Sequence, residues 1–121
     1  MLESYKQLEV WQRSIELVKE IYRTTEKFPK SEIYGLSSQM RRSAVSIPSN
    51  IAEGYKRQGL GEYLQFLSIA DASAAELETQ LIIAKNIYLN LDFLKVESLL
   101  IEIQKMLFVL IKKLNNKRII G

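Results

Sequence analysis

The chain has 121 residues, 47% of them apolar, and carries 17 Lys and Arg against 14 Asp and Glu, a net charge of +3 at pH 7. This length suits one globular domain, so we expect a single domain over residues 1–121. Cys and His are both absent from the sequence, which excludes disulfides, Ser-His-Asp hydrolases, Cys proteases and zinc fingers. The composition therefore favours a role in binding or assembly.

The first predicted helix covers about residues 5–27. Its apolar residues recur at alternating steps of three and four, which places them on one face, and they are Leu8, Trp11, Ile15, Val18 and Tyr22. The helix is expected to end at Phe28, because the residue before Pro29 avoids the α region.

The second predicted helix covers about residues 36–57, with its apolar side at Leu36, Met40, Ala44, Ile47, Ile51 and Tyr55. Pro48 lies in the middle of this pattern, where a missing N–H donor predicts a kink. Gly54 falls on the apolar side. It indicates either a close approach of two helices or fraying toward the turn at 59–61.

The third and fourth predicted helices cover about residues 61–89 and 92–115. The third has eight apolar positions without a break: Tyr63, Leu67, Ala70, Ala74, Leu77, Leu81, Ala84 and Tyr88. The fourth has Asp92 as its expected N-cap and an apolar stripe of Phe93, Val96, Leu100, Ile103, Leu107, Leu110 and Leu114. Beyond residue 115 the periodicity is lost.

Short connections between four amphipathic helices predict an all-α, antiparallel up-down-up-down four-helix bundle. The alternative is a three-helix core whose first helix is swapped onto a neighbouring chain. The longest apolar run, Met106–Ile111, has six residues, whereas a membrane span needs roughly 20. The start of the chain also lacks the apolar run of a signal peptide. We therefore expect a cytoplasmic protein with no membrane partner.

The last two helices carry more apolar residues than one stripe requires. These residues form either a broad core in a monomer or a subunit interface, and we favour the interface because large exposed apolar patches are uncommon on monomers. The expected interface residues of this homo-oligomer are Leu64, Ile82, Ile83, Ile101, Phe108 and Ile111.

The second helix also has a polar stripe of Arg42, Ser46, Ser49, Glu53, Lys56 and Arg57, flanked by Arg41 and Asn50. Arginine forks and small hydroxyls are typical of surfaces that contact phosphate. The candidate nucleic-acid-binding residues are therefore Arg41, Arg42, Lys56 and Arg57. Two alternatives stay open. The stripe could be a solvated face with a Glu53–Arg57 pair, or Arg41 or Arg42 could pair with Glu62 or Glu76 across helices.

A second basic cluster lies near the end of the fourth helix, at Lys112, Lys113, Lys117 and Arg118. The helix dipole favours cations there, and the alternative is that such clusters, repeated around a ring of subunits, form a collective positive field. Candidate groups for catalysis are Glu53, Glu62, Asp71, Glu76 and Lys85, but a di-metal centre on a bundle uses Glu-x-x-His pairs, and a Gly-rich phosphate loop is missing. We expect no enzymatic activity, no metal and no cofactor.

Several blocks of the sequence resemble one known family. They are Leu8–Trp11, Ser38–Tyr55, Glu62–Ala70 and Ser73–Glu78, and the string from Ser46 to Gly54 is the most specific. Together they resemble the bacterial 23S ribosomal RNA intervening-sequence proteins over nearly the whole chain. Ala72 departs from the pattern, since many relatives are expected to have glycine there.

The resemblance implies a four-helix bundle that assembles as a ring-like homopentamer. Related accessory proteins of diversity-generating retroelements bind nucleic acid and a reverse transcriptase, which implies RNA or another nucleic acid as a partner. The implied binding positions are again Arg41, Arg42, Lys56 and Arg57, and the family supplies no catalytic residues. Two functions stay open: an RNA-binding or ribonucleoprotein accessory module, and a protein-interaction scaffold that does not bind nucleic acid.

Overall fold

The computed structural model describes residues 4–120. Within this range lie four α-helices, α1 (Glu9–Thr25), α2 (Leu36–Tyr55), α3 (Leu60–Ile87) and α4 (Leu94–Ile120), and two 3-10 turns at Tyr5–Gln7 and Lys30–Glu32. Residues 1–3 and 121, which belong to the expected domain 1–121, lie outside the described part.

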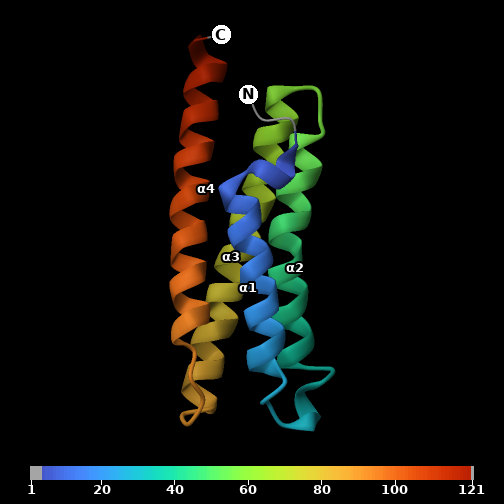
Figure 1. Cartoon of the computed structure of the whole chain (residues 1–121), viewed down its shortest axis with the longest axis vertical. Helices are drawn as coiled ribbons and strands as arrows, with labels where there is room; N and C mark the ends of the chain where they lie inside the picture. Colours follow the sequence, from blue (N-terminus) through green and yellow to red (C-terminus); the bar gives the residue numbers. More distant parts are fainter. Residues whose placement is uncertain (1–3, 121) are drawn as a thin grey trace.

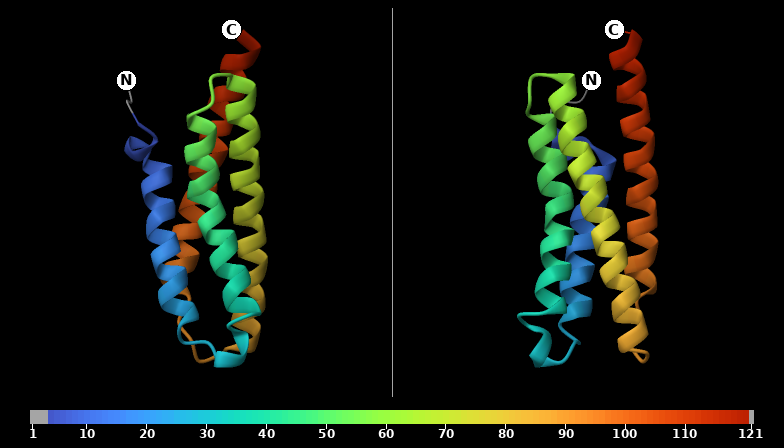
Figure 2. Two further views of the ribbon diagram at one scale, coloured as in Figure 1. Left: turned by 90° about the vertical axis from the view of Figure 1, so that its right-hand side faces the viewer. Right: turned by 180° about the vertical axis from the view of Figure 1, so that it is seen from behind.

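Successive helices run in opposite directions along one long axis (Figure 1). Each helix packs against its neighbours in the chain, and α1 also packs against α4, which closes a bundle of four (Figure 2). The predicted up-down-up-down arrangement is confirmed, and α1 lies against α2 and α4 of its own chain. None of the helices in the described range is long and apolar enough to cross a membrane.

The predicted helix boundaries are wrong at two places. The first helix begins at Glu9 instead of about residue 5, because Leu8 is extended and the Ser4 side chain accepts a hydrogen bond from the Lys6 amide and caps a separate 3-10 turn. The fourth helix continues to Ile120 instead of ending near 115. Residues 115–119 are exposed, so their helix requires no apolar periodicity.

The start of α4 agrees with the sequence. The Asp92 carboxylate accepts a hydrogen bond of 2.9 Å from the Leu94 amide, which satisfies one of the free donors at the helix N-terminus. The helix α2 runs without interruption through Pro48, which is buried.

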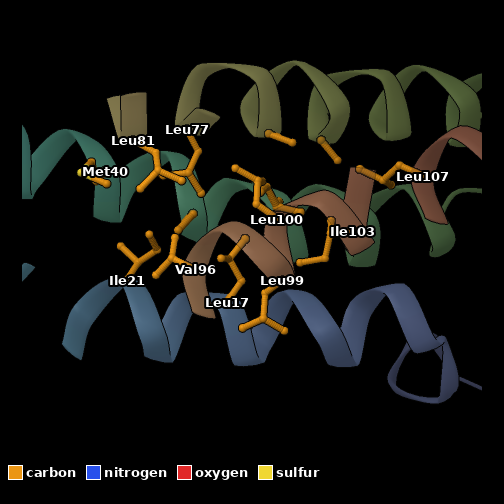
Figure 3. Packing of buried hydrophobic residues seen from close by; sticks show 14 of the residues in the cluster. Leu17, Ile21, Met40, Leu77, Leu81, Val96, Leu99, Leu100, Ile103 and Leu107 are labelled. Carbon is orange, nitrogen blue, oxygen red and sulfur yellow. The ribbon is translucent and has the colours of Figure 1, made fainter. Parts of the chain in front are cut away.

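One apolar cluster draws residues from all four helices (Figure 3). The predicted stripes of α2, α3 and α4 are confirmed, with Met40, Leu77 and Ile103 among their fully buried members. On α1 the predicted stripe is correct only in part. Its members Leu8, Trp11 and Val18 pack against the core, but Tyr22 is 44% exposed, and the fully buried apolar residues are Leu17 and Ile21.

The correct face of α1 was hidden by polar residues that lie within it. Ser14 is fully buried and donates to the Trp11 carbonyl at 2.7 Å. Thr25 is buried as well and donates to the Ile21 carbonyl at 2.6 Å. Because the backbone of their own helix satisfies these hydroxyls, they can occupy a core face at little cost.

The α2–α3 seam is close-packed and partly polar. A Cβ atom added at Gly54 would lie 2.7 Å from the Cβ of Phe66, so Gly54 marks a close helix approach and the fraying alternative is wrong. Along the same seam Ser43 donates to Glu76 at 2.9 Å, and the hydroxyls of Ser46 and Ser73 lie 2.8 Å apart.

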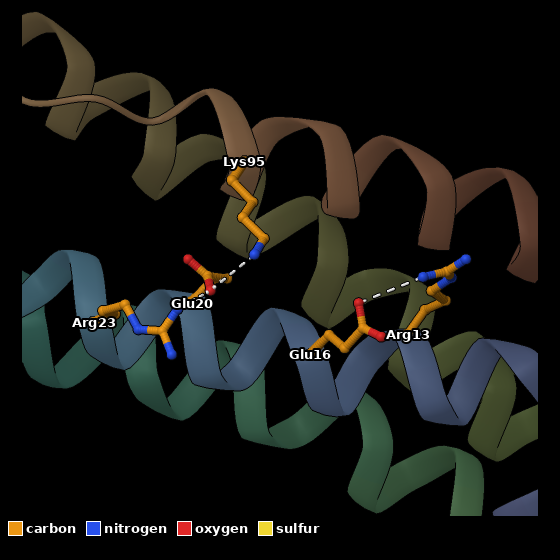
Figure 4. Close-up of polar contacts among 5 residues, drawn as sticks. All are labelled: Arg13, Glu16, Glu20, Arg23 and Lys95. Atoms are coloured by element: carbon orange, nitrogen blue, oxygen red, sulfur yellow. Dashed lines mark hydrogen bonds and ion pairs between the residues drawn. The ribbon is translucent and has the colours of Figure 1, made fainter.

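The α1–α4 seam is joined by ion pairs. Glu20 of α1 lies 3.4 Å from the Lys95 ammonium of α4 and 2.6 Å from an Arg23 nitrogen on its own helix (Figure 4). Closer to the start of α1, Arg13 pairs with Glu102 of α4 at 2.9 Å. These pairs are partly exposed, so each adds little free energy, but they fix the lateral register of the two helices.

The end of the bundle that holds the α1–α2 connection is joined by an aromatic contact. The Tyr88 hydroxyl donates to the Glu32 carboxylate at 2.5 Å, and the Phe28 and Tyr88 ring centroids lie 4.7 Å apart. The hydrogen bond to Glu32, with burial and the negative charge of Glu32, raises the pKa of Tyr88 above 10.0. The first connection is thereby attached to the end of α3.

Candidate nucleic-acid interface

The structure gives the four candidate cations different environments. Arg41 is half-buried, donates from its Nε to the Thr25 hydroxyl at 2.9 Å, and lies 4.6 Å above the ring of Tyr22. A guanidinium held by a hydrogen bond and a cation–π contact on the neighbouring helix joins α2 to α1. Arg41 is therefore a structural residue in this fold.

The other three candidates are exposed. Arg57 lies 3.3 Å from Glu53 and 4.8 Å above the Phe66 ring, so the predicted Glu53–Arg57 pair is confirmed. Arg42 and Lys56 are exposed and have no ion pair within residues 4–120. These two cations are free to meet an anionic ligand.

The alternative in which Arg41 or Arg42 pairs with Glu76 does not hold within residues 4–120, where Glu76 accepts a hydrogen bond from Ser43. Glu62 likewise has no ion pair with either arginine in the described range. Ser46 of the polar stripe is bonded to Ser73 of α3 and accepts a hydrogen bond from the flanking Asn50, so this part of the stripe belongs to the helix seam.

The candidate cations do not form one compact site. Arg42 and Lys56 are fourteen residues apart on one helix, which separates them by about 21 Å along its axis. Arg42 lies near the start of α2, and Lys56 follows its last residue.

The fold brings a second group of cations to the end of the bundle that holds Lys56 and Arg57. The sequence pattern did not connect these two groups. The end of α4 lies at the same end of the bundle as the α2–α3 turn (Figures 1 and 2). The Arg118 guanidinium lies so close to α3 that a Cβ atom added at Gly61 would be 3.6 Å from one of its nitrogens. We call this group the basic end: Lys56, Arg57, Lys112, Lys117 and Arg118.

Few acidic residues oppose the basic end. After Glu102 the sequence contains five basic residues and none that is acidic. Glu53 near the end of α2 is paired with Arg57, which leaves Glu62 in the first turn of α3. The second basic cluster was visible in the sequence, but only the antiparallel fold places it at the same end of the bundle as Lys56.

Two aromatic residues lie beneath the basic end. The rings of Tyr55 and Tyr63 meet edge to face with centroids 6.0 Å apart, next to Gly54. Burial, and secondarily the neighbouring Tyr55, raises the pKa of Tyr63 above 10.0. A tyrosine is neutral near neutral pH, so Tyr63 adds no negative charge to this end.

The predicted interface residues also separate into two groups. Ile82, Ile83, Ile101 and Phe108 are exposed, and Phe108 is the most exposed at 67%. Leu64 is 7% exposed and Ile111 packs against the core cluster, so these two are corrections to the expected exposed set. Leu64 belongs to the interior of the chain, whereas Ile111 is only partly buried.

The acidic and lysine candidates for catalysis are dispersed. Glu53 pairs with Arg57, Glu76 accepts from Ser43, and Lys85 pairs with Glu97 at 2.8 Å. Among residues 4–120, His, Cys, Asp and Glu form no group of three or more that could hold a metal ion.

Comparisons with known proteins place this bundle in a family. Over 85% of its length the chain is similar to 98% of a protein of unknown function from the S23 ribosomal protein family of Bacteroides thetaiotaomicron, with a TM-score of 0.75 and 26% identity. A search of curated proteins finds no match. The sequence model of the 23S rRNA-intervening sequence proteins matches residues 6–109, and the chain belongs to this family.

Proposed function

We propose that this protein is a non-catalytic RNA-binding accessory module of the cytoplasm that binds the phosphate backbone at its basic end. The observation that carries the proposal is the position of Lys56, Lys117 and Arg118 at one end of the bundle, exposed and without acidic partners in the described range. Clustered cations on one surface are the electrostatic signature of nucleic-acid binding. Membership of the 23S rRNA-intervening sequence family supports RNA as the ligand.

The proposed contact is largely independent of base sequence. Lysine and arginine side chains on α4 and on the α2–α3 turn would neutralise phosphates and release counterions. Arg57 keeps its guanidinium near the Phe66 ring, where it could also stack on an exposed base.

The proposal is tested with a single-stranded RNA and measured affinity at several salt concentrations. The logarithm of the association constant is expected to fall linearly with that of salt, by about 0.7 for each phosphate contact. The double variant Lys117→Glu, Arg118→Glu should lower affinity by about tenfold or more and flatten this slope.

The matched control is Lys27→Glu, Lys30→Glu at the opposite end of the bundle, where both lysines are exposed. Each double variant removes four units of charge from the +3 of the chain, so both have a net charge of −1. Equal loss of affinity in the two variants would show a net-charge effect and contradict a site at the basic end. Absence of RNA binding at low salt would reject the function itself.

We also propose that the chain assembles as a homo-oligomer, for which the resemblance implies a pentamer. Support comes from exposed apolar side chains on α3 and α4, including Ile82, Ile101 and Phe108, because apolar surface of this kind is uncommon on monomers. Light scattering at micromolar concentration should report a particle several times the 14.0 kDa of one chain. A particle of 14.0 kDa contradicts assembly. The exposed apolar surface would then be available to a different protein partner.

A further inference from the structure

The start of α1 and the stretch of α4 from Lys105 to Lys113 form an apolar groove that the bundle leaves open. It has a volume of about 360 Å³, and its floor is made by Leu8, Val10, Met106 and Val109. Val10 is buried, whereas Val109 is half exposed. The groove therefore offers apolar surface that no other part of the described chain covers.

Helix length explains why this groove exists. The helix α1 begins only at Glu9, whereas α4 continues to Ile120. Farther down the same seam the two helices are joined by the pair Glu20–Lys95 (Figure 4) and by the pair Arg13–Glu102. On the N-terminal side of Arg13 no further ion pair joins α1 to α4 within residues 4–120. There the chain leaves the seam through the 3-10 turn at Tyr5–Gln7.

The rim of the groove is positively charged. Lys105 and Lys113 line it at four residues to either side of Val109, so they lie one turn below and one turn above this side chain. Both lysines are exposed and have no ion pair in the described range. Glu9 is the single acidic residue among the residues that line the groove.

We propose that this groove binds an acidic amphipathic helix of a partner protein. The matching helix has two carboxylates two turns apart, at i and i+7, and leucines at i+3 and i+4 between them. The lysine spacing of eight residues corresponds to about 12 Å, which such a pair of carboxylates can span. The leucines would cover Val109 and Met106, in the helix-in-groove mode of recognition.

The shape of the groove favours a helix over a small ligand. Small-molecule sites surround most of the ligand surface, whereas this groove is bounded by two helices and is open where α1 begins, at Glu9. A partner helix placed there would lie in line with α1, beyond its first residue, Glu9. This inference uses a surface other than the basic end and does not depend on RNA binding.

The test uses two synthetic helical peptides of about sixteen residues, a little over four turns. Both carry leucines at i+3 and i+4, and one has Glu whereas the other has Lys at i and i+7. By fluorescence anisotropy the Glu peptide is expected to bind at least about tenfold more tightly than the Lys peptide. Val109→Glu should weaken Glu-peptide binding by about tenfold or more, because it places a charge in the apolar contact.

The decisive variant is the double charge swap Lys105→Glu, Lys113→Glu, which should reverse the preference and favour the Lys peptide. The control Lys27→Glu, Lys30→Glu alters net charge equally and should keep the original preference. The proposal is overturned if the two peptides bind equally well, or if the charge swap does not reverse the preference for the Glu peptide. It is also overturned if the Glu peptide does not bind while Val109→Glu dissociates an assembly in sedimentation, since a second copy then fills the groove.

Discussion

Replacing Gly54 with alanine is expected to lower the free energy of unfolding by about 2 kcal/mol. The added Cβ would lie 2.7 Å from the Phe66 Cβ and 3.2 Å from the Tyr63 carbonyl oxygen. Neither atom can move without a shift of α3, and such overpacking costs about 1–3 kcal/mol. Alanine returns at most about 1 kcal/mol through its higher helix propensity, so the net effect is a loss.

Urea unfolding followed by circular dichroism measures this loss, at one protein concentration because assembly also stabilises a chain. Gly61→Ala is the matched control, since its Cβ would meet its nearest neighbour, Arg118, at an ordinary 3.6 Å. This variant should be as stable as the parent or slightly more stable. If Gly54→Ala leaves the free energy of unfolding unchanged, α2 and α3 do not approach each other as closely as the structure places them.

Substituting Arg41 should lower the stability of the protein, whereas substituting the adjacent Arg42 should not. Arg41→Met removes a charge-assisted hydrogen bond to Thr25 and a cation–π contact with Tyr22. Methionine matches arginine in helix propensity, so the loss reflects these contacts and is expected to be about 1–2 kcal/mol. RNA affinity of the folded variant should stay within about twofold of the parent, because one exposed charge is worth little at a distance.

Arg42→Met removes the same charge from an exposed position. Its free energy of unfolding should change by less than about 0.5 kcal/mol, and the salt slope of RNA binding should stay that of the parent, because Arg42 lies near the start of α2, about 21 Å along the helix from Lys56. Thermal unfolding and the RNA titration are measured on both variants. If Arg41→Met loses RNA affinity but keeps its stability, Arg41 is an RNA-binding residue and not a structural one.

Much of the fold could be predicted from the sequence because periodicity reports burial. The α3 stripe from Leu67 to Ala84 and the α2 stripe from Met40 to Ile51 are buried as predicted. The pattern failed in part on α1, where Ser14 and Thr25 occupy the core face and bond to their own backbone. It also failed at the end of α4, since an exposed helix has no apolar pattern to detect.

The candidate site could be predicted only in part. Residue type and spacing identified the polar stripe of α2, but could not distinguish Arg41, which binds Thr25, from Arg42, which stays exposed. The distinction depends on where α1 lies beside α2. A local pattern carries no information about such a partner sixteen residues away.

The sequence by itself determined that this protein is a helical bundle without the Cys and His of common catalytic and metal sites, because composition and periodicity are properties of the chain alone. Tertiary structure decided which charges act together. The antiparallel path returns Lys117 and Arg118 to the turn that follows Lys56, and the short α1 exposes the groove beside Val109. Both surfaces arise from the relative lengths and directions of helices that lie far apart in the sequence.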